Sequence, residues 1–143
     1  GSGRRMSAAT EPWLVQPQGH KDFAFVTVLW SDDYVDAVMA WAAGLIAVGS
    51  TFGRLCMVVR ALMWDELLDK LQRCCCDIVD VEPIQSPWKA TRGASRYELA
   101  LTKLRVLQLA DAGYRKVVLM DSDILVLQNI DELFWFPAPA ATV

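Results

Sequence analysis

Two carboxylates with one serine between them are the residues of this chain whose types and spacing best suit chemistry. Asp121 and Asp123 flank Ser122 within the stretch KVVLMDSDILVLQNIDELF, residues 116–134. Carboxylates two apart in extended backbone point to the same side, and two anionic oxygen donors suit a hard cation such as Mg²⁺ or Mn²⁺. Such a cation keeps open positions that substrate phosphates fill. A solvated turn between two strands is the alternative that these residues alone leave open.

Other familiar catalytic sets are disfavoured by the sequence. No Gly-x-Gly-x-x-Gly follows the first predicted strand and no Gly-Lys-Ser/Thr loop exists, which disfavours a dinucleotide fold and a P-loop enzyme. His20 is the only histidine and precedes that strand, so we do not expect a Ser-His-Asp or Cys-His set in this segment. Cys56 and the three consecutive cysteines Cys74–Cys76 lack the spacing of zinc ligands, and we interpret them as small apolar residues near a core. A disulfide from Cys56 would require an oxidising compartment.

Composition is that of a globular domain. The 143 residues are enough for one domain with a core, and 54% hydrophobic with 22% charged residues argues against disorder. A formal net charge of −3 disfavours a nucleic-acid partner. The most apolar stretch, residues 37–49, is too short to span a bilayer and predicts a buried helix.

The elements that must position the two aspartates follow from hydrophobic periodicity. Residues 1–21 are polar with several Pro and Gly and are predicted to be a flexible leader. We expect strands at residues 23–30, 54–60, 76–84, 116–120 and 124–127, and helices at 32–48, 63–73, 96–114 and 129–136, the last capped by Asn129. This alternation predicts the α/β class with a mainly parallel sheet and right-handed crossovers. Ligands of such sheets bind beyond the carboxyl ends of the strands, where the aspartates and the segment Ser31–Asp33 are expected.

Residues 101–137 closely resemble glycosyltransferase family eight, the glycogenin-like enzymes. The matching features are TKL, then Tyr-x-Lys-Val-Val, then Asp-x-Asp, then LVL-x-NIDELF, all in a fixed register. A weaker likeness covers residues 23–34, and both RYELALTK and the final residues lean toward the plant glucuronosyltransferase-like branch. The resemblance implies a GT-A fold, in which a Rossmann-like sheet is flanked by helices. It also implies that residues 22–143 are the N-terminal, nucleotide-sugar-binding part of the domain, incomplete at the carboxyl end.

The resemblance further implies a UDP-sugar donor and Mn²⁺, or Mg²⁺ in its place, with Asp121 and Asp123 as metal ligands. The nucleotide-sugar site it implies consists of Val28, Trp30, Ser31, Tyr34, Arg96, Lys103, Asp121, Ser122 and Asp123. The residue chemistry agrees, since a metal and basic side chains stabilise a leaving diphosphate while aromatic rings stack on a base. The residues alone leave an alternative open for each of these side chains. Lys103 would then be a solvated helix residue, and Arg96 would pair with an acidic side chain. Trp30 and Tyr34 would be core residues.

The implied activity is transfer of a hexose or hexuronic acid, with retention, to a glycan, protein or lipid acceptor. The family's third metal ligand, a histidine, and its acceptor residues have no counterpart in this segment, so we assign no catalytic residue and expect little activity from the 143 residues alone. Trp30 and Ser31 stand where the glycogenin pattern has Thr and Asn. A truncated or degenerate family member without catalysis, acting as a binding module, is the rival hypothesis, and a metal-dependent nucleotidyltransferase is a third. Golgi or cytoplasmic location and a homodimer stay open.

Overall fold

A computed structural model describes residues 23–74, 77–85 and 94–139. The predicted leader, Cys75, Cys76 and the loop 86–93 therefore lie outside the described residues. None of the described helices has the length and apolar character needed to cross a membrane.

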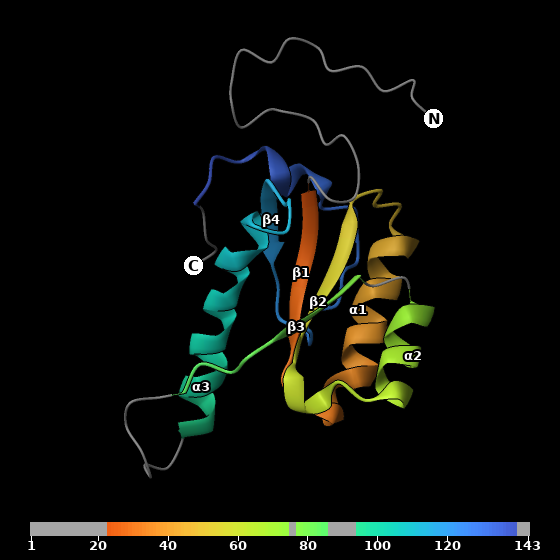
Figure 1. Cartoon of the computed structure of the whole chain (residues 1–143). Helices are drawn as coiled ribbons and strands as arrows, with labels where there is room; N and C mark the ends of the chain where they lie inside the picture. The colour runs from red at the N-terminus through yellow and green to blue at the C-terminus, as the bar shows by residue number, and fades with distance from the viewer. Residues whose placement is uncertain (1–22, 75–76, 86–93, 140–143) are drawn as a thin grey trace.

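A four-stranded parallel sheet forms the centre of the fold (Figure 1). Its strands are β1 (Phe23–Leu29), β2 (Gly53–Val59), β3 (Asp77–Val81) and β4 (Lys116–Leu119), in the order β3-β2-β1-β4. Every neighbouring pair is parallel, so the carboxyl ends of all four strands lie along one edge. The predicted α/β class with a parallel sheet is confirmed.

The central strand β1 explains why the sequence folds in layers. All seven of its residues are buried, as expected of a strand that is covered on both faces. Phe23, Phe25 and Leu29 join an apolar cluster with α1 and α2, whereas Val26 and Val28 join a second cluster that includes residues of α3 and the turns after it. Figure 1 shows α1 and α2 on one side of the sheet and α3 on the other.

The helices differ from prediction mainly at their ends. They are α1 (Val35–Ala47), preceded by the 3₁₀ turn η2 (Asp32–Tyr34), then α2 (Asp65–Arg73) and α3 (Ala94–Thr102). Short 3₁₀ segments η3 (Arg60–Leu62), η4 (Lys103–Ala110) and η5 (Asp131–Trp135) follow β2, α3 and the aspartate turn. After α1, Gly49 has a φ of 80°, a left-handed conformation that favours glycine and ends the helix where predicted. The single helix predicted for 96–114 is wrong, because α3 tightens into η4 at Lys103.

The predicted fifth strand at 124–127 is also wrong. Among the described residues, 124–127 pair with no strand of the sheet and have no strand structure. Val126 alone is buried there, and it packs on α1, where a Cβ built on Gly44 would lie 3.4 Å from the Val126 carbonyl oxygen. Leu125 and Leu127 are exposed. The apolar run therefore reflects one inward contact and not a two-sided strand.

The segment after this run is fastened to the amino-terminal edge of the sheet. Asn129 Oδ1 accepts a hydrogen bond from the Asp131 backbone N–H at 2.9 Å, but the N-cap of the short η5 is Ile130, so the predicted helix at 129–136 capped by Asn129 is wrong. The Ser50 hydroxyl donates to Asp131 Oδ1 at 2.6 Å. Phe134 is fully buried, and its ring lies 5.3 Å from Phe23 between centroids. These contacts close the α1 side of the core.

The described cysteines pack against the same core. Cys56 is fully buried in β2, and Cys74 at the end of α2 is half-buried against the same apolar cluster. Burial raises the pKa of the Cys56 thiol to about 12. A thiol so far from ionisation is a poor nucleophile and metal ligand. Cys56 thus fits the interpretation as a small apolar core residue.

Candidate functional site

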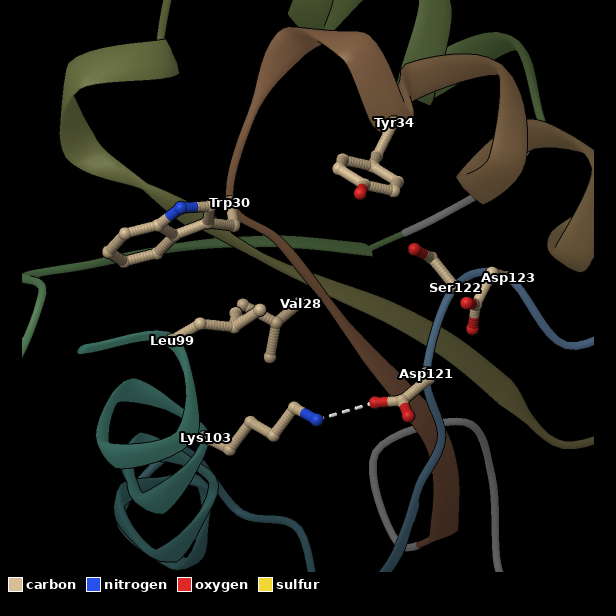
Figure 2. A pocket seen from close by; sticks show the side chains of 8 residues that line it. All are labelled: Val28, Trp30, Tyr34, Leu99, Lys103, Asp121, Ser122 and Asp123. Atoms are coloured by element: carbon tan, nitrogen blue, oxygen red, sulfur yellow. Dashed lines mark hydrogen bonds and ion pairs between the residues drawn. The ribbon is translucent and has the colours of Figure 1, made fainter. Parts of the chain in front are cut away.

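A hollow with a volume of about 170 Å³ lies where the carboxyl ends of β1 and β4 meet α3 (Figure 2). Its lining consists of Val28, Trp30, Tyr34, Leu99, Lys103, Asp121, Ser122 and Asp123. The structure therefore brings together every described side chain of the predicted nucleotide-sugar site except Ser31, and the Arg96 side chain lies outside the described residues. Their roles in binding are not tested by this geometry and stay predictions.

The end of β1 supplies the apolar side of the hollow. Val28 is buried on the α3 face of the sheet, and Trp30 follows the strand and packs partly against the same cluster. Tyr34 ends η2 and keeps about half of its surface exposed. In Figure 2 the rings of Trp30 and Tyr34 flank the hollow from above, over Val28. An exposed aromatic beside a half-buried one leaves flat apolar surface available for stacking.

Ser31 is used by the backbone that carries these aromatics. Its hydroxyl accepts from the Asp33 backbone N–H at 3.4 Å and so caps the η2 turn. Ser31 is not among the residues that line the hollow. The Arg96 side chain lies outside the described residues, although the residue belongs to α3.

The end of β4 supplies the acidic side. The Met120 N–H donates to the Val26 carbonyl at 2.8 Å, which extends the β1–β4 pairing by one residue and places the next residues at the sheet edge. Asp121, Ser122 and Asp123 then form a turn, in which the Ile124 N–H approaches the Asp121 carbonyl at 3.4 Å. Both carboxylates line the hollow and are exposed to solvent. This position avoids the cost of burying unpaired charge.

Lys103 reaches across the hollow to this turn. Its Nζ lies 2.6 Å from Asp121 Oδ1, with side-chain exposures of 33% and 57% for the lysine and the aspartate (Figure 2). Lys103 is therefore directed into the hollow from the start of η4. An ion pair this exposed is worth only about 0–1 kcal/mol, so an incoming anion or cation can displace it.

The acidic pair fits a divalent cation that retains several other ligands. In the part of the chain that the structure describes, no group of three or more His, Cys, Asp and Glu side chains could hold a metal ion. The carboxylates that line the hollow are those of Asp121 and Asp123. Mg²⁺-type ions are commonly held by one or two carboxylates plus water and substrate phosphates. A divalent cation would also turn the local excess of negative charge into a net positive one, which suits a diphosphate.

Leu99 lines the hollow although sequence reasoning did not select it. It stands one helical turn before Lys103, so the two share a face, and Figure 2 shows it beside Val28 below Trp30. The spacing of four residues between Leu99 and Lys103 was the sequence signal that could have placed Leu99 beside the site. Leucine at helical spacing normally indicates core, and Leu99 does pack against the β1 cluster as well as lining the hollow.

The parallel sheet and the hollow at the carboxyl ends of its strands place this chain among the α/β domains that bind ligands at that edge. No family model matches the chain. Three plant relatives are similar to it. Galactinol synthase 3 of Arabidopsis thaliana is 33% identical over 121 residues, which cover 83% of this chain and 35% of that protein. Galactinol synthase 1 of Solanum lycopersicum is 35% identical over 119 residues, covering 80% and 36%.

The third relative is the putative UDP-glucuronate:xylan alpha-glucuronosyltransferase 5 of Arabidopsis thaliana, 32% identical over 125 residues that cover 82% of this chain and 20% of that protein. The chain thus spans about a third of the length of the galactinol synthases it matches. This similarity over most of the chain supports the resemblance of residues 101–137 to glycosyltransferase family eight.

Proposed function

We propose that the chain forms the donor-binding part of a retaining glycosyltransferase that transfers a hexose or hexuronic acid from a UDP-sugar, with Mn²⁺ held by Asp121 and Asp123. The observation that carries the proposal is the convergence of two carboxylates, one lysine and two aromatic rings on one hollow in a chain that resembles glycosyltransferase family eight. The name of one relative includes UDP-glucuronate, which supports a UDP-sugar as donor.

Each side chain of the hollow has a use in this reaction. Breaking the sugar–phosphate bond releases a diphosphate, and a bound Mn²⁺ would supply Lewis-acid stabilisation of that leaving group. Lys103, now paired with Asp121, would donate a charge-assisted hydrogen bond to a phosphate oxygen. Trp30, Tyr34, Val28 and Leu99 would offer the uracil ring an apolar surface.

The size of the hollow supports the binding of one part of a nucleotide sugar by the described residues. Its volume of about 170 Å³ is below the roughly 300–1,000 Å³ that is typical of small-molecule sites. Such a volume suits one portion of a nucleotide sugar and not donor and acceptor together. We therefore assign base and diphosphate contacts to this hollow and no residue to the acceptor.

Calorimetric titration of the protein with UDP tests the proposal. We expect binding at least about tenfold tighter with Mn²⁺ than with EDTA, because a cation held by Asp121 and Asp123 would offset the negative charge of the diphosphate. Titration with uridine, which lacks the diphosphate, is the control and should show no dependence on Mn²⁺. Equal UDP binding with and without Mn²⁺ would reject the metal-assisted site.

Replacing Lys103 with methionine is expected to have opposite effects on two ligands. UDP binding in Mn²⁺ should weaken by about tenfold to a hundredfold, because a hydrogen bond to a charged group contributes about 1.5–3 kcal/mol. Binding of Mn²⁺ alone should be unchanged or tighter, because Asp121 loses its competing cation. Calorimetry with each ligand measures both effects, and K70M, on the exposed face of α2, is the matched control. A parallel loss of both affinities would indicate disruption of the turn instead.

A further inference from the structure

Thr102 is a fully buried polar residue immediately before Lys103. It is the last residue of α3, at the point where the α-helix tightens into η4. A hydroxyl in an apolar interior is unfavourable unless it is hydrogen-bonded. The hydrogen bonds of Thr102 therefore indicate why a threonine is accommodated there.

The Thr102 hydroxyl joins two separate parts of the chain. It donates to the Glu98 carbonyl at 2.6 Å, one turn earlier in α3. It also accepts the Ile84 backbone N–H at 3.0 Å, from the segment that leaves β3. A hydroxyl that bonds back to the i−4 carbonyl commonly bends a helix, and here the helix changes its winding at the next residue. One side chain thus sets both the end of α3 and its attachment to the sheet.

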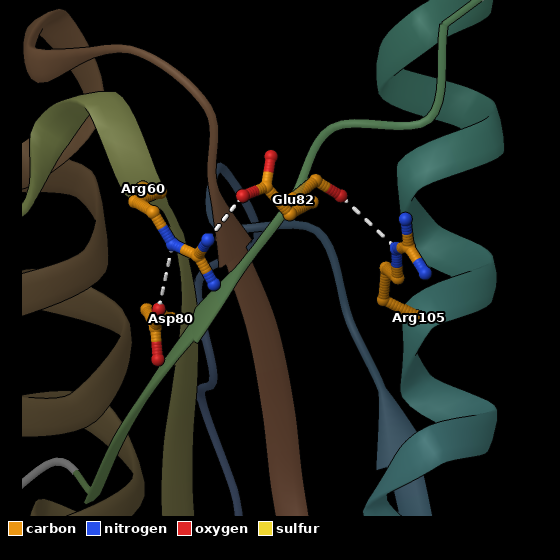
Figure 3. Close-up of polar contacts among 4 residues, drawn as sticks. All are labelled: Arg60, Asp80, Glu82 and Arg105. Atoms are coloured by element: carbon orange, nitrogen blue, oxygen red, sulfur yellow. Dashed lines mark hydrogen bonds and ion pairs between the residues drawn. The ribbon is translucent and has the colours of Figure 1, made fainter.

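A second contact lies on the other side of Lys103. Arg105 Nε donates to the Glu82 backbone carbonyl at 3.0 Å, and Arg60 binds the carboxylates of Asp80, at 3.0 Å, and Glu82 (Figure 3). The segment that leaves β3 is consequently held between η3 and η4, as Figure 3 shows. The Arg105 contact is exposed to solvent, whereas the Thr102 contacts are part-buried and the Thr102 side chain is fully buried, so Thr102 provides the firmer attachment.

We propose that Thr102 is a positioning residue whose hydroxyl fixes the start of η4 and thereby directs Lys103 Nζ toward Asp121. A lysine side chain has many rotamers, so the place of its backbone decides which groups its ammonium reaches. The role of Lys103 toward a diphosphate rests on the proposed function. The orientation of Lys103 toward Asp121 does not, because the ion pair is a property of the protein without ligand.

Amine labelling tests the proposal without any ligand. The protein is treated briefly with acetic anhydride, and the acetylation of Lys103 relative to that of the exposed Lys70 is quantified by mass spectrometry. T102V keeps the side-chain shape but removes the hydroxyl, so it should raise the relative labelling of Lys103 several-fold. T102S, which retains the hydroxyl, should restore the original value. T51V, an exposed threonine at the opposite edge of the sheet, should change nothing.

UDP binding in Mn²⁺ gives the second readout. T102V should weaken it by about tenfold, at the low end of the effect of residues that orient a ligand-binding group. In the K103M background the same substitution should have no further effect, because Thr102 acts through Lys103. If T102V is insoluble, T102A replaces it, since the smaller side chain leaves room for a water to satisfy the Ile84 N–H.

The outcomes separate this inference from the proposed function. Unchanged Lys103 labelling in T102V, or equal effects of T102V with and without Lys103, would overturn the positioning role. Absence of Mn²⁺-dependent UDP binding in the unmodified protein, with labelling that still responds to T102V and T102S, would reject the proposed function and leave the positioning role supported.

Discussion

Replacing Asp123 with alanine is expected to lower the affinity for UDP in Mn²⁺ by at least about tenfold. Changes to residues that merely orient metal ligands cost about 10–100-fold, and a lost ligand should cost no less. Asp123 is the better choice of the two carboxylates, because among the described ion pairs Asp121 is engaged with Lys103 and Asp123 is in none. The change therefore removes a donor without releasing a lysine.

Calorimetry with UDP and Mn²⁺ measures this effect, and D111A is its control. Asp111 is an exposed carboxylate at the end of η4 and does not line the hollow, so its removal changes the net charge equally. We expect D111A to bind like the unmodified protein. If D123A binds UDP as tightly as D111A in Mn²⁺, then Asp123 holds no cation and the two-carboxylate site is wrong.

Replacing Phe134 with alanine is expected to reduce the free energy of unfolding by about 3–5 kcal/mol, the usual range for a buried phenylalanine. Phe134 is fully buried, and its ring centroid lies 4.7 Å from those of both Phe25 and Phe52 in edge-on contacts. The substitution would leave a cavity between the central strand and the segment that closes it. Urea unfolding followed by tryptophan fluorescence measures the change.

Two companion variants make this prediction specific. Phe136 is two residues further on and about half exposed, so F136A should change the free energy of unfolding by no more than about 0.5 kcal/mol. F134L, which refills much of the cavity, should lose clearly less stability than F134A. Similar losses for F134A and F136A would show that η5 does not anchor the core.

The sequence was most informative where a pattern had one physical cause. A nearly continuous apolar run of this length is typical of a central parallel strand, so β1 was predicted to within one residue. Asp121 and Asp123 were predicted at the sheet edge because charge has no place within β4 or the core. The hollow then follows from the parallel topology, which brings the ends of β1 and β4 together.

Features decided by tertiary contacts escaped prediction. The run at 124–127 has strand-like composition, but whether it pairs depends on a neighbouring strand, and only Val126 finds a buried partner. The change of winding after Thr102 depends on a hydrogen bond to Ile84, 18 residues away, which local periodicity does not encode. Leu99 was missed because a leucine at helical spacing has the same signature in a core and in a binding surface.

The β1–β4 pairing has a consequence for the order in which the chain folds. Its register joins Phe23 with Lys116, whereas the β1–β2 register joins Ala24 with Gly53, a far shorter loop. Closing the longer loop carries the larger entropic penalty and delays contacts that depend on it. Trp30 and Asp121 stand on opposite sides of that late pairing, so the hollow is completed only when the last strand docks. A ligand that binds the hollow would accordingly bind only chains in which β4 has paired, and it would shift the folding equilibrium toward the complete sheet.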